Sequence, residues 1–324
     1  ICAVFAAMVG ISGAAVVAMG TIALPSMLER GYDKSMALGV INTGGGWGIL
    51  IPPSILMILY ALITGVSVGK MFAAGIMPGV LLMVLTAIYI IVRCHLQPEL
   101  APALPKEDRG TWPEKFRALR AVLLPIGVVV MVLGSIIGGI TTPTEAAAMG
   151  VLGALISAAV YRQFKWSILK EAAIRTFKLT GMIMWILFAA HAFSAAYQSM
   201  GAQELIEGLM NMVPGGPWGI IIAMMVIVFL LAMVLDPVGI MLITLPVFMP
   251  IVESLGFDPI WFGILFVINM EIGYMTPPFG FNLFYLKGIV PPSITMKDIY
   301  KSIIPFVIVE IIGIILIMIF PEIA

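Results

Sequence analysis

The sequence predicts an all-α protein that crosses a membrane several times. Hydrophobic residues make up 61% of the 324 residues, charged residues only 10%, and the mean hydropathy is +1.14. A soluble domain of this size needs far more charge to cover its surface. Several apolar stretches also approach or exceed the roughly 20 residues that span a bilayer as a helix. They are Met71–Arg93, Leu119–Ile140, Leu179–Met200 and Ser302–Phe320.

The basic residues gather in segments that can share one side of the membrane. Sixteen of the seventeen Lys and Arg residues lie at Arg30 and Lys34, within 93–120, within 162–178, at Lys287, and at Lys297 and Lys301. The positive-inside rule makes that side cytoplasmic, with Lys70 as the exception. The opposite loops carry acidic residues and no Lys or Arg; these acidic residues are Glu204, Glu207, Glu253 and Asp258.

One pattern occurs twice, at an offset of 225 residues. The matching pairs are Pro25 with Pro250, Gly31-Tyr32-Asp33 with Gly256-Phe257-Asp258, Gly48 with Gly273, and Pro52-Pro53 with Pro277-Pro278. Five predicted crossings separate the copies, at 36–63, 71–93, 119–140, 146–161 and 179–200. Because five is odd, the second copy enters the membrane from the opposite face. Inverted repeats are typical of alternating-access transporters, whose site lies near the middle of the bilayer.

Each copy contains a short apolar helix behind a polar tip, followed by an interrupted segment. The runs 14–28 and 238–252 measure about 22 Å at 1.5 Å per residue, less than the ~30 Å hydrocarbon core. They are therefore predicted as arms of two re-entrant hairpins. The interruptions are 44–54 and 273–280, and each holds a double proline. Because proline donates no N–H and biases the preceding residue towards extended geometry, each helix must break there.

The breaks leave main-chain groups that are costly in hydrocarbon unless something binds them. Free carbonyl groups suit Na⁺, and the N-termini of half-helices suit a carboxylate. The predicted ion-binding residues are Ser12, Gly13, Gly45, Gly48, Ile51, Asp236, Gly239, Gly273, Met275 and Thr276. The predicted substrate-binding residues are Pro53, Ser54, Pro278 and Gly280. Cys2 and Cys94 are far apart and the two histidines are isolated, so neither a transition-metal site nor a cofactor is expected.

Several of these residues have a structural alternative. Asp236 is expected deep in the protein, either as an ion ligand or as the N-cap of the next helix. Ser54 either contacts a ligand or caps a half-helix, and Thr276 either contacts a ligand or bonds a local carbonyl. Glu271 either binds a cation or anchors a helix by a hydrogen bond. Glu310 is expected at a scaffold or subunit interface.

Six motifs along the chain resemble the large membrane subunit of TRAP (tripartite ATP-independent periplasmic) transporters, the DctM-like or SiaM-like family. They are Ile11-Ser12-Gly13, Arg30–Lys34, Gly48–Ser54, Ala74–Gly79, Thr142–Ala147 and Gly273–Gly280. The resemblance runs from Ile1 to Ala324 and implies that about the first quarter of the family's subunit is missing. Family members often read Ser-Gly-Ser at the first tip, where this chain has Ser12-Gly13-Ala14. One hydroxyl ligand is absent there. Residues 141–145 are expected to be a structural capping motif.

The resemblance implies an elevator-type transporter of the bacterial inner membrane that takes up a small organic acid with Na⁺. It implies two partners, a small DctQ-like membrane subunit and a periplasmic substrate-binding protein. The expected parts are transport-domain unit 1 at 1–64, scaffold helices at 65–217 with cytoplasmic loops at 94–118 and 162–178, transport-domain unit 2 at 218–288, and a C-terminal scaffold helix at 289–324.

Three other functions remain as alternatives. A stand-alone divalent-anion:sodium symporter has a related architecture, but the Ser-Asn-Thr tripeptides typical of its tips are absent here. A membrane enzyme usually carries a paired catalytic motif, and the sequence contains none. A passive channel does not need inverted pairs of hairpins. No Lys or Arg lies in a predicted membrane core, so an anionic substrate must be held without a guanidinium group.

Overall fold

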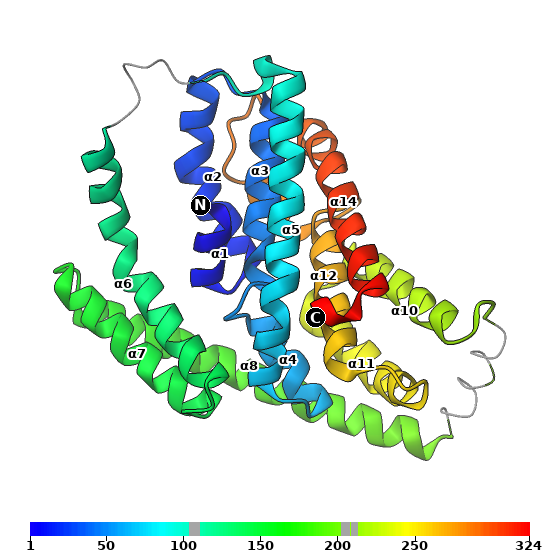
Figure 1. The fold of residues 1–324 in the computed structure, drawn as a ribbon. Helices are drawn as coiled ribbons and strands as arrows, with labels where there is room; N and C mark the ends of the chain where they lie inside the picture. The colour runs from blue at the N-terminus through cyan, green and yellow to red at the C-terminus, as the bar shows by residue number, and fades with distance from the viewer. Residues whose placement is uncertain (104–110, 202–207, 209–212) are drawn as a thin grey trace.

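The computed structural model describes residues 1–103, 111–201, 208 and 213–324, and its regular structure in those ranges is helical (Figure 1). The acidic residues Glu204 and Glu207 and the middle of the predicted 94–118 loop lie outside the described residues. Six helices are long and apolar enough to cross a membrane, judged by length and composition. They are Ser12–Glu29, Val68–Leu96, Pro143–Val160, the Trp166–Phe193 part of a longer helix, Pro237–Ser254 and Met296–Ile319.

The first unit contains four α-helices and a 3₁₀ turn. They are α1 (Cys2–Val9), α2 (Ser12–Glu29), α3 (Lys34–Gly46), η1 (Trp47–Ile49) and α4 (Ile55–Thr64). Gly10 ends α1 in the left-handed region, at φ 69°, where a residue without a Cβ is favoured. The Asp33 carboxylate accepts the Met36 N–H at 3.0 Å and starts α3. The double proline follows η1, and its helix resumes only at Ile55, as predicted.

The second unit has the same order of elements. They are α10 (Gly216–Ala232), α11 (Pro237–Ser254), α12 (Pro259–Tyr274) and α13 (Phe281–Lys287). Both α2 and α11 have 18 residues, and they begin 225 positions apart. The same offset separates the first residues of α3 and α12. Each of these two helices is capped by an aspartate, and Asp258 accepts the Ile260 and Trp261 N–H groups at 2.6 and 3.1 Å.

The two hairpin helices differ in length from the prediction. The sequence predicts runs of 15 residues, whereas α2 and α11 have 18 residues and measure about 27 Å. The first turns recruit Ser12 and Pro237 from the polar tips, and the last turns continue to Glu29 and Ser254. A polar residue ends a run of apolar residues in the sequence, but the helix can continue through it. Length alone therefore does not separate a re-entrant arm from a span.

The remaining helices connect and flank the two units. They are α5 (Val68–Leu96), η2 (Pro98–Leu100), α6 (Trp112–Ile137), α7 (Pro143–Val160), α8 (Trp166–Ser199), α14 (Met296–Ile319) and η4 (Pro321–Ile323). The predicted loop at 162–178 is helical from Trp166 onward, because its basic residues form the polar first part of α8. Helices α6 and α7, green in Figure 1, lie to one side of the packed helices, and α8 runs beneath them. Within the described chain, almost no residue of α7 or of the apolar part of α8 is fully buried.

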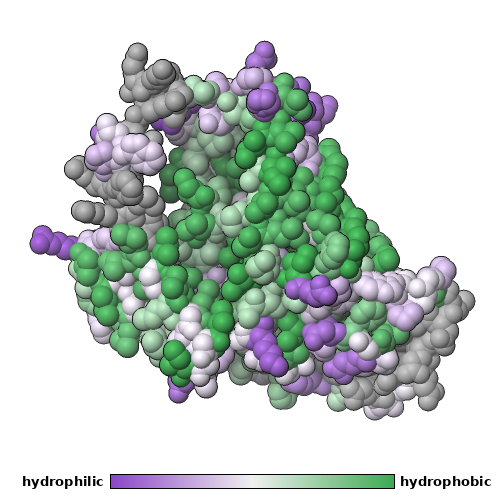
Figure 2. All heavy atoms as spheres, in the orientation of Figure 1, coloured by the Kyte–Doolittle hydropathy of each residue, from purple (hydrophilic) through white to green (hydrophobic). Residues whose placement is uncertain are grey.

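The buried hydrophobic residues form two clusters, one around α12 with α4, α5, α10 and α11, and one made by α2, α3, α13 and α14. Every residue of α12 from Trp261 to Tyr274 is buried, which explains its continuous apolar run. Gly39 of α3 lets Phe306 of α14 approach so closely that a Cβ would lie 2.1 Å from the ring. Figure 2 shows an apolar surface over the middle of the molecule, with hydrophilic residues gathered towards its upper and lower ends. That distribution is typical of a protein surrounded by lipid.

The start of α7 provides a test of a purely structural motif. Thr142 and Glu145 form a capping box, in which the Glu145 carboxylate accepts the Thr142 N–H at 2.8 Å. This confirms the structural interpretation of residues 141–145. We expect Thr142→Ala to lower the free energy of unfolding by about 1 kcal/mol, measured by thermal unfolding, without changing transport per folded molecule. An unchanged unfolding temperature would contradict the capping role.

Candidate functional site

The first tip, Gly10 and Ile11 between α1 and α2, lies against the first break, residues 47–54. A Cβ added to Gly48 would lie 3.0 Å from the Ile11 carbonyl carbon, and one added to Gly10 would lie 2.7 Å from the Pro53 oxygen. The Ile55 N–H donates to the Gly10 oxygen at 3.4 Å. Main chain therefore contacts main chain here, and carbonyl groups of both segments gather in a small volume.

The second tip, residues 233–236 between α10 and α11, lies beside the second break, residues 275–280. A Cβ on Gly273 would lie 2.3 Å from the Ala232 Cβ and 3.0 Å from the Ala232 carbonyl carbon. Gly273, near the end of α12, thus packs on the last residue of α10, next to the second tip. Gly48 and Gly273 occupy matching positions in the two units, but their neighbours do not match, because Ile11 corresponds to Asp236 and not to Ala232.

The two breaks also approach each other across the molecule. A Cβ on Gly46, at the end of α3, would lie 2.8 Å from Glu271 Oε1 and 3.4 Å from Met275 Sδ. Helix α2 packs on α13, and a Cβ on Gly13 would lie 2.6 Å from the Tyr285 ring. The tips and breaks predicted from distant parts of the chain therefore form one connected region.

The structure places most predicted ion-binding residues in that region. Ser12 and Gly45 are buried, and a Cβ on Gly45 would lie 2.8 Å from the Val16 nitrogen. Met275 is buried at the second break, whereas Ile51 is half-buried and packs on Gly79 of α5. Close packing of main chain on main chain is what the glycines of these segments make possible.

The side chains of the predicted site act on local main chain. Ser54 is buried, donates to the Ile49 oxygen and accepts the Met57 N–H at 3.4 Å, so it caps α4. Thr276 donates to the Ile272 oxygen at 2.6 Å. The structural alternatives for both hydroxyls are confirmed. Their contact with an ion or substrate stays a prediction.

Asp236 corrects one expectation and confirms another. Its carboxylate accepts the Gly239 N–H at 3.0 Å, which makes it the N-cap of α11. The prediction that it lies deep in the protein is wrong, because Asp236 is exposed within the described chain. Val234 in the same tip is 51% exposed. The other described residues therefore leave the Asp236 carboxylate uncovered.

The predicted substrate residues are divided between surface and interior. Ser54 is buried and Pro53 half-buried at the first break, whereas Pro278 is exposed at the second. Gly280 is buried and starts α13 at φ 55°, the left-handed region that favours glycine. Of the two breaks, the second is therefore the more accessible, at Pro278.

Several buried polar groups lie near the breaks; sequence reasoning named Glu271 and Glu310 but missed Asn42, Thr43 and Asn282. Glu310, expected at an interface, is fully buried and accepts the Trp47 indole N–H at 2.9 Å. Glu271 is fully buried too, and neither oxygen has a hydrogen-bond partner among the described residues, so the alternative of an anchoring hydrogen bond is not seen there. Buried side chains of Asn42, Thr43 and Asn282 also lack partners within the described residues. The sequence could have indicated these groups, because polar residues inside apolar membrane helices are rare.

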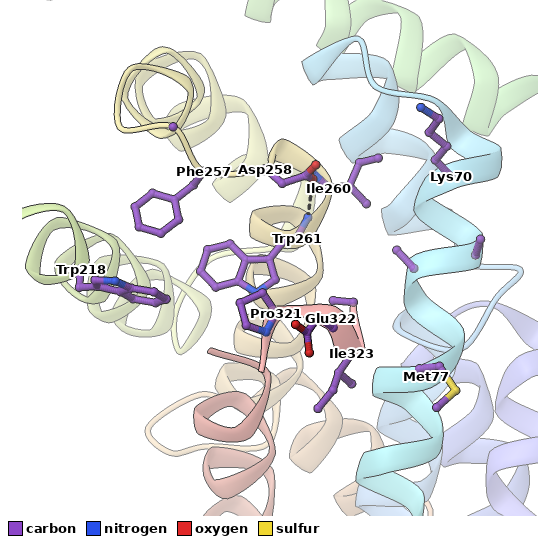
Figure 3. A pocket seen from close by; sticks show the side chains of 14 residues that line it. Lys70, Met77, Trp218, Phe257, Asp258, Ile260, Trp261, Pro321, Glu322 and Ile323 are labelled. Atoms are coloured by element: carbon purple, nitrogen blue, oxygen red, sulfur yellow. Dashed lines mark hydrogen bonds between the residues drawn. The ribbon is translucent and has the colours of Figure 1, made fainter. Parts of the chain in front are cut away.

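A separate pocket of about 610 Å³ opens where α5 and α12 begin (Figure 3). Lys70 and Asp258 line it together with the aromatic rings of Trp218, Phe257 and Trp261. The Phe257 and Trp261 rings stack with their centroids 5.4 Å apart. None of the predicted ion- or substrate-binding residues lines this pocket. Aromatic residues gather at membrane–water interfaces, which fits a pocket at the helix ends rather than at the breaks.

The family model of the DctM component of tripartite ATP-independent periplasmic transporters matches residues 1–323. The chain belongs to this family. It is a large permease subunit, an integral protein of the inner membrane and not an enzyme. Large permease subunits of the DctM family work with a small membrane subunit and a periplasmic binding protein.

Curated relatives of the DctM family match over the whole chain or nearly so. The ectoine TRAP transporter large permease protein TeaC of Halomonas elongata is 36% identical over 100% of this chain and 74% of its own length. The C4-dicarboxylate TRAP transporter large permease protein DctM of Vibrio cholerae is 37% identical over 94% of this chain and 71% of its own.

One solved structure shares the fold. The YdaH transporter of Alcanivorax borkumensis superposes with a TM-score of 0.58 at 15% identity, over 96% of this chain and 83% of its own. At that identity the likeness extends to the fold alone. It agrees with the arrangement of helices in this DctM-family chain.

Proposed function

We propose that this chain takes up a small organic acid, a carboxylate, driven by a cation gradient, with Na⁺ as the coupling ion. The observation that carries the proposal is the packing of each break beside a tip: Gly48 contacts Ile11 in the first tip, and Gly273, just before the second break, contacts Ala232, just before the second tip. Unpaired carbonyl and N–H groups at such breaks are natural ligands for a cation and for a carboxylate. Both breaks, each with its neighbouring tip, lie in one connected region.

The same geometry supports an inverted-repeat transporter with two re-entrant hairpins. Matching elements start at one constant offset, and five predicted crossings separate the two units. In such transporters the site lies between the repeats, and the access changes by movement of one part against another. We infer an elevator-type movement, in which units 1 and 2 move together against the scaffold helices.

A contact between α3 and α14 crosses the proposed boundary. The buried hydrogen bond from Trp47 to Glu310 joins unit 1 to the C-terminal helix assigned to the scaffold. If α14 stays with the scaffold, this bond must break in every cycle. Cross-linking of paired cysteines at Gly39 and Phe306, which are in contact here, measures whether the two helices separate during transport.

The chemistry of the relatives' solutes supports a carboxylate substrate. Ectoine and C4-dicarboxylates, which appear in the names of the relatives, both carry a carboxylate group. The predicted membrane core of this chain holds no Lys or Arg, so helix N-termini, hydroxyl groups or a bound cation must balance the substrate's charge. This favours a solute with little net charge over a strongly charged dicarboxylate.

Uptake into proteoliposomes tests the proposal. The full permease with its small membrane subunit is reconstituted, and labelled acids are supplied with or without the periplasmic binding protein and an inward Na⁺ gradient. We expect accumulation only when both are present, and a choline gradient in place of Na⁺ serves as control. Accumulation that needs neither would overturn the proposal. Accumulation with Na⁺ but without the binding protein would favour the stand-alone symporter, which no feature of the structure now favours.

A further inference from the structure

Two glutamate side chains are buried at the centre of the molecule, and their carboxyl groups have few hydrogen-bond partners among the described residues. Glu271 of α12 and Glu310 of α14 are both fully buried. Glu310 Oε1 accepts the Trp47 indole N–H at 2.9 Å, but its Oε2 and both oxygens of Glu271 have no partner within the described residues. Burying an ionised carboxylate without a partner is strongly unfavourable. Something must balance these two groups.

Both carboxyl groups converge on the last turn of α3. Glu271 Oε1 lies 2.8 Å from the position that a Cβ on Gly46 would occupy. The next residue, Trp47, bonds Glu310, and the two carboxyl groups are close enough to interact electrostatically. The absence of a side chain at Gly46 is what leaves room for the Glu271 carboxylate. Three helices thus bring two acidic side chains to one point.

A proton shared between the two groups does not fit this arrangement. A shared proton requires an O–H···O⁻ hydrogen bond, which is typically 2.5–2.7 Å long. No hydrogen bond joins Glu271 to Glu310, since the oxygens concerned have no partner at all. Within the described residues neither glutamate forms an ion pair with a Lys, Arg or His side chain; the ion pair found there joins Arg175 to Glu171. Each buried carboxyl group must therefore bind either a proton of its own or a cation.

A third oxygen is available on the same face of α3. Asn42 is fully buried, and neither its Oδ1 nor its Nδ2 has a partner within the described ranges. It precedes Gly46 by four residues, the spacing that places two positions on one face of a helix. With the amide oxygen of Asn42, the free oxygens of the two carboxylates offer an all-oxygen set of ligands, which hard cations prefer.

We propose that Glu271 and Glu310, with the side-chain oxygen of Asn42, bind a Na⁺ ion where α3, α12 and α14 meet. This inference rests on the proposed Na⁺ coupling and adds, beside the breaks, a site whose ligands are not among the predicted ion-binding residues. Because its ligands come from three helices, the ion stabilises their packing. Binding of Na⁺ should therefore raise the unfolding temperature of the protein.

The test measures Na⁺ binding rather than transport. Binding of Na⁺ to the purified full permease complex is followed by titration calorimetry and by the Na⁺-dependent shift in Tm, with choline chloride holding the ionic strength constant. Glu271→Gln and Glu310→Gln remove one charge each at nearly constant volume. We expect each to weaken Na⁺ binding about tenfold or more and to abolish the Tm shift at a Na⁺ concentration that saturates the wild type.

A matched control separates the site from general electrostatics. Glu253→Gln makes the same chemical change at an exposed carboxylate of α11 and should leave the Na⁺ affinity unchanged. Should the two buried variants fail to fold, Asn42→Ala keeps both charges and is measured in their place, with weaker Na⁺ binding expected.

Two results would overturn the inference. If the wild type binds Na⁺ and the Glu271, Glu310 and Asn42 variants bind it equally well, this site is wrong and the proposed Na⁺ coupling stands. If the wild type binds no Na⁺ and its uptake needs no Na⁺ gradient, both the site and the coupling fail. The uptake assay on the wild type therefore distinguishes the two failures.

Discussion

Gly273→Ala is expected to reduce uptake more than tenfold. The new Cβ would lie 2.3 Å from the Ala232 Cβ and 3.0 Å from the Ala232 carbonyl carbon, and the main chain cannot rotate away as a side chain does. Overpacking of this kind usually costs about 1–3 kcal/mol of stability. Here the strain acts on the second tip, because α10 must shift relative to the end of α12. Uptake into proteoliposomes, divided by the amount of folded protein, measures the effect.

The other unit and a distant helix supply the matched comparisons. Gly48→Ala meets the Ile11 carbonyl carbon at 3.0 Å and its oxygen at 3.1 Å, so the same loss is expected at the first tip. Gly134 lies inside α6 with nothing within 4 Å of a new Cβ. Gly134→Ala should leave uptake unchanged and raise stability by about 0.5–1 kcal/mol. Wild-type uptake by both Gly48→Ala and Gly273→Ala would show that the contacts are not needed.

Asp236→Asn is expected to weaken the dependence of uptake on Na⁺ at least about tenfold, the loss typical of a disturbed metal site. Asparagine caps a helix about as well as aspartate, so α11 keeps its bond to the Gly239 N–H and its stability. Only the negative charge at the exposed tip is removed. The measurement is the Na⁺ concentration that gives half-maximal uptake, with thermal unfolding as the check on folding.

Asp258→Asn is the matched control for that variant. Asp258 caps α12 in the same way and lies outside the predicted site, so its Na⁺ titration should equal that of the wild type. Asp236→Ala removes both the charge and the cap. Its free energy of unfolding should therefore be about 1 kcal/mol lower than that of Asp236→Asn, which lowers its unfolding temperature. A normal Na⁺ titration in Asp236→Asn would exclude Asp236 from the ion site.

Local chemistry explains which parts of the fold were predictable. The double prolines fix the breaks because proline lacks an N–H whatever surrounds it, and the helices stop at Gly46 and Tyr274 accordingly. The aspartate caps at the starts of α11 and α12 follow from the same kind of short-range rule. The helical start of α8 was missed, because basic residues were taken as a sign of a loop although they are compatible with a helix.

Long-range contacts explain what sequence reasoning could not reach. Trp47 and Glu310 are 263 residues apart, and nothing in either local sequence indicates that they form a hydrogen bond. The burial of Glu271 likewise depends on the approach of Gly46, which is distant in the sequence. Asp236 was placed too deep because its apolar neighbours suggested the interior, whereas its side chain is exposed within the described chain. Patterns along the chain identify segments, but only packing decides which faces meet.

The hydroxyl groups beside the breaks limit the kind of ligand that they can serve. The Thr276 hydroxyl donates its one hydrogen bond to the Ile272 oxygen, and the Ser54 hydroxyl donates its own to the Ile49 oxygen. In this conformation neither can donate to an anionic solute, although the remaining lone pair of Thr276 can face an electron-poor species. An acid that binds at the second break must therefore take its hydrogen bonds from amide nitrogens, from the Tyr274 hydroxyl, which has no partner among the described residues, or from water.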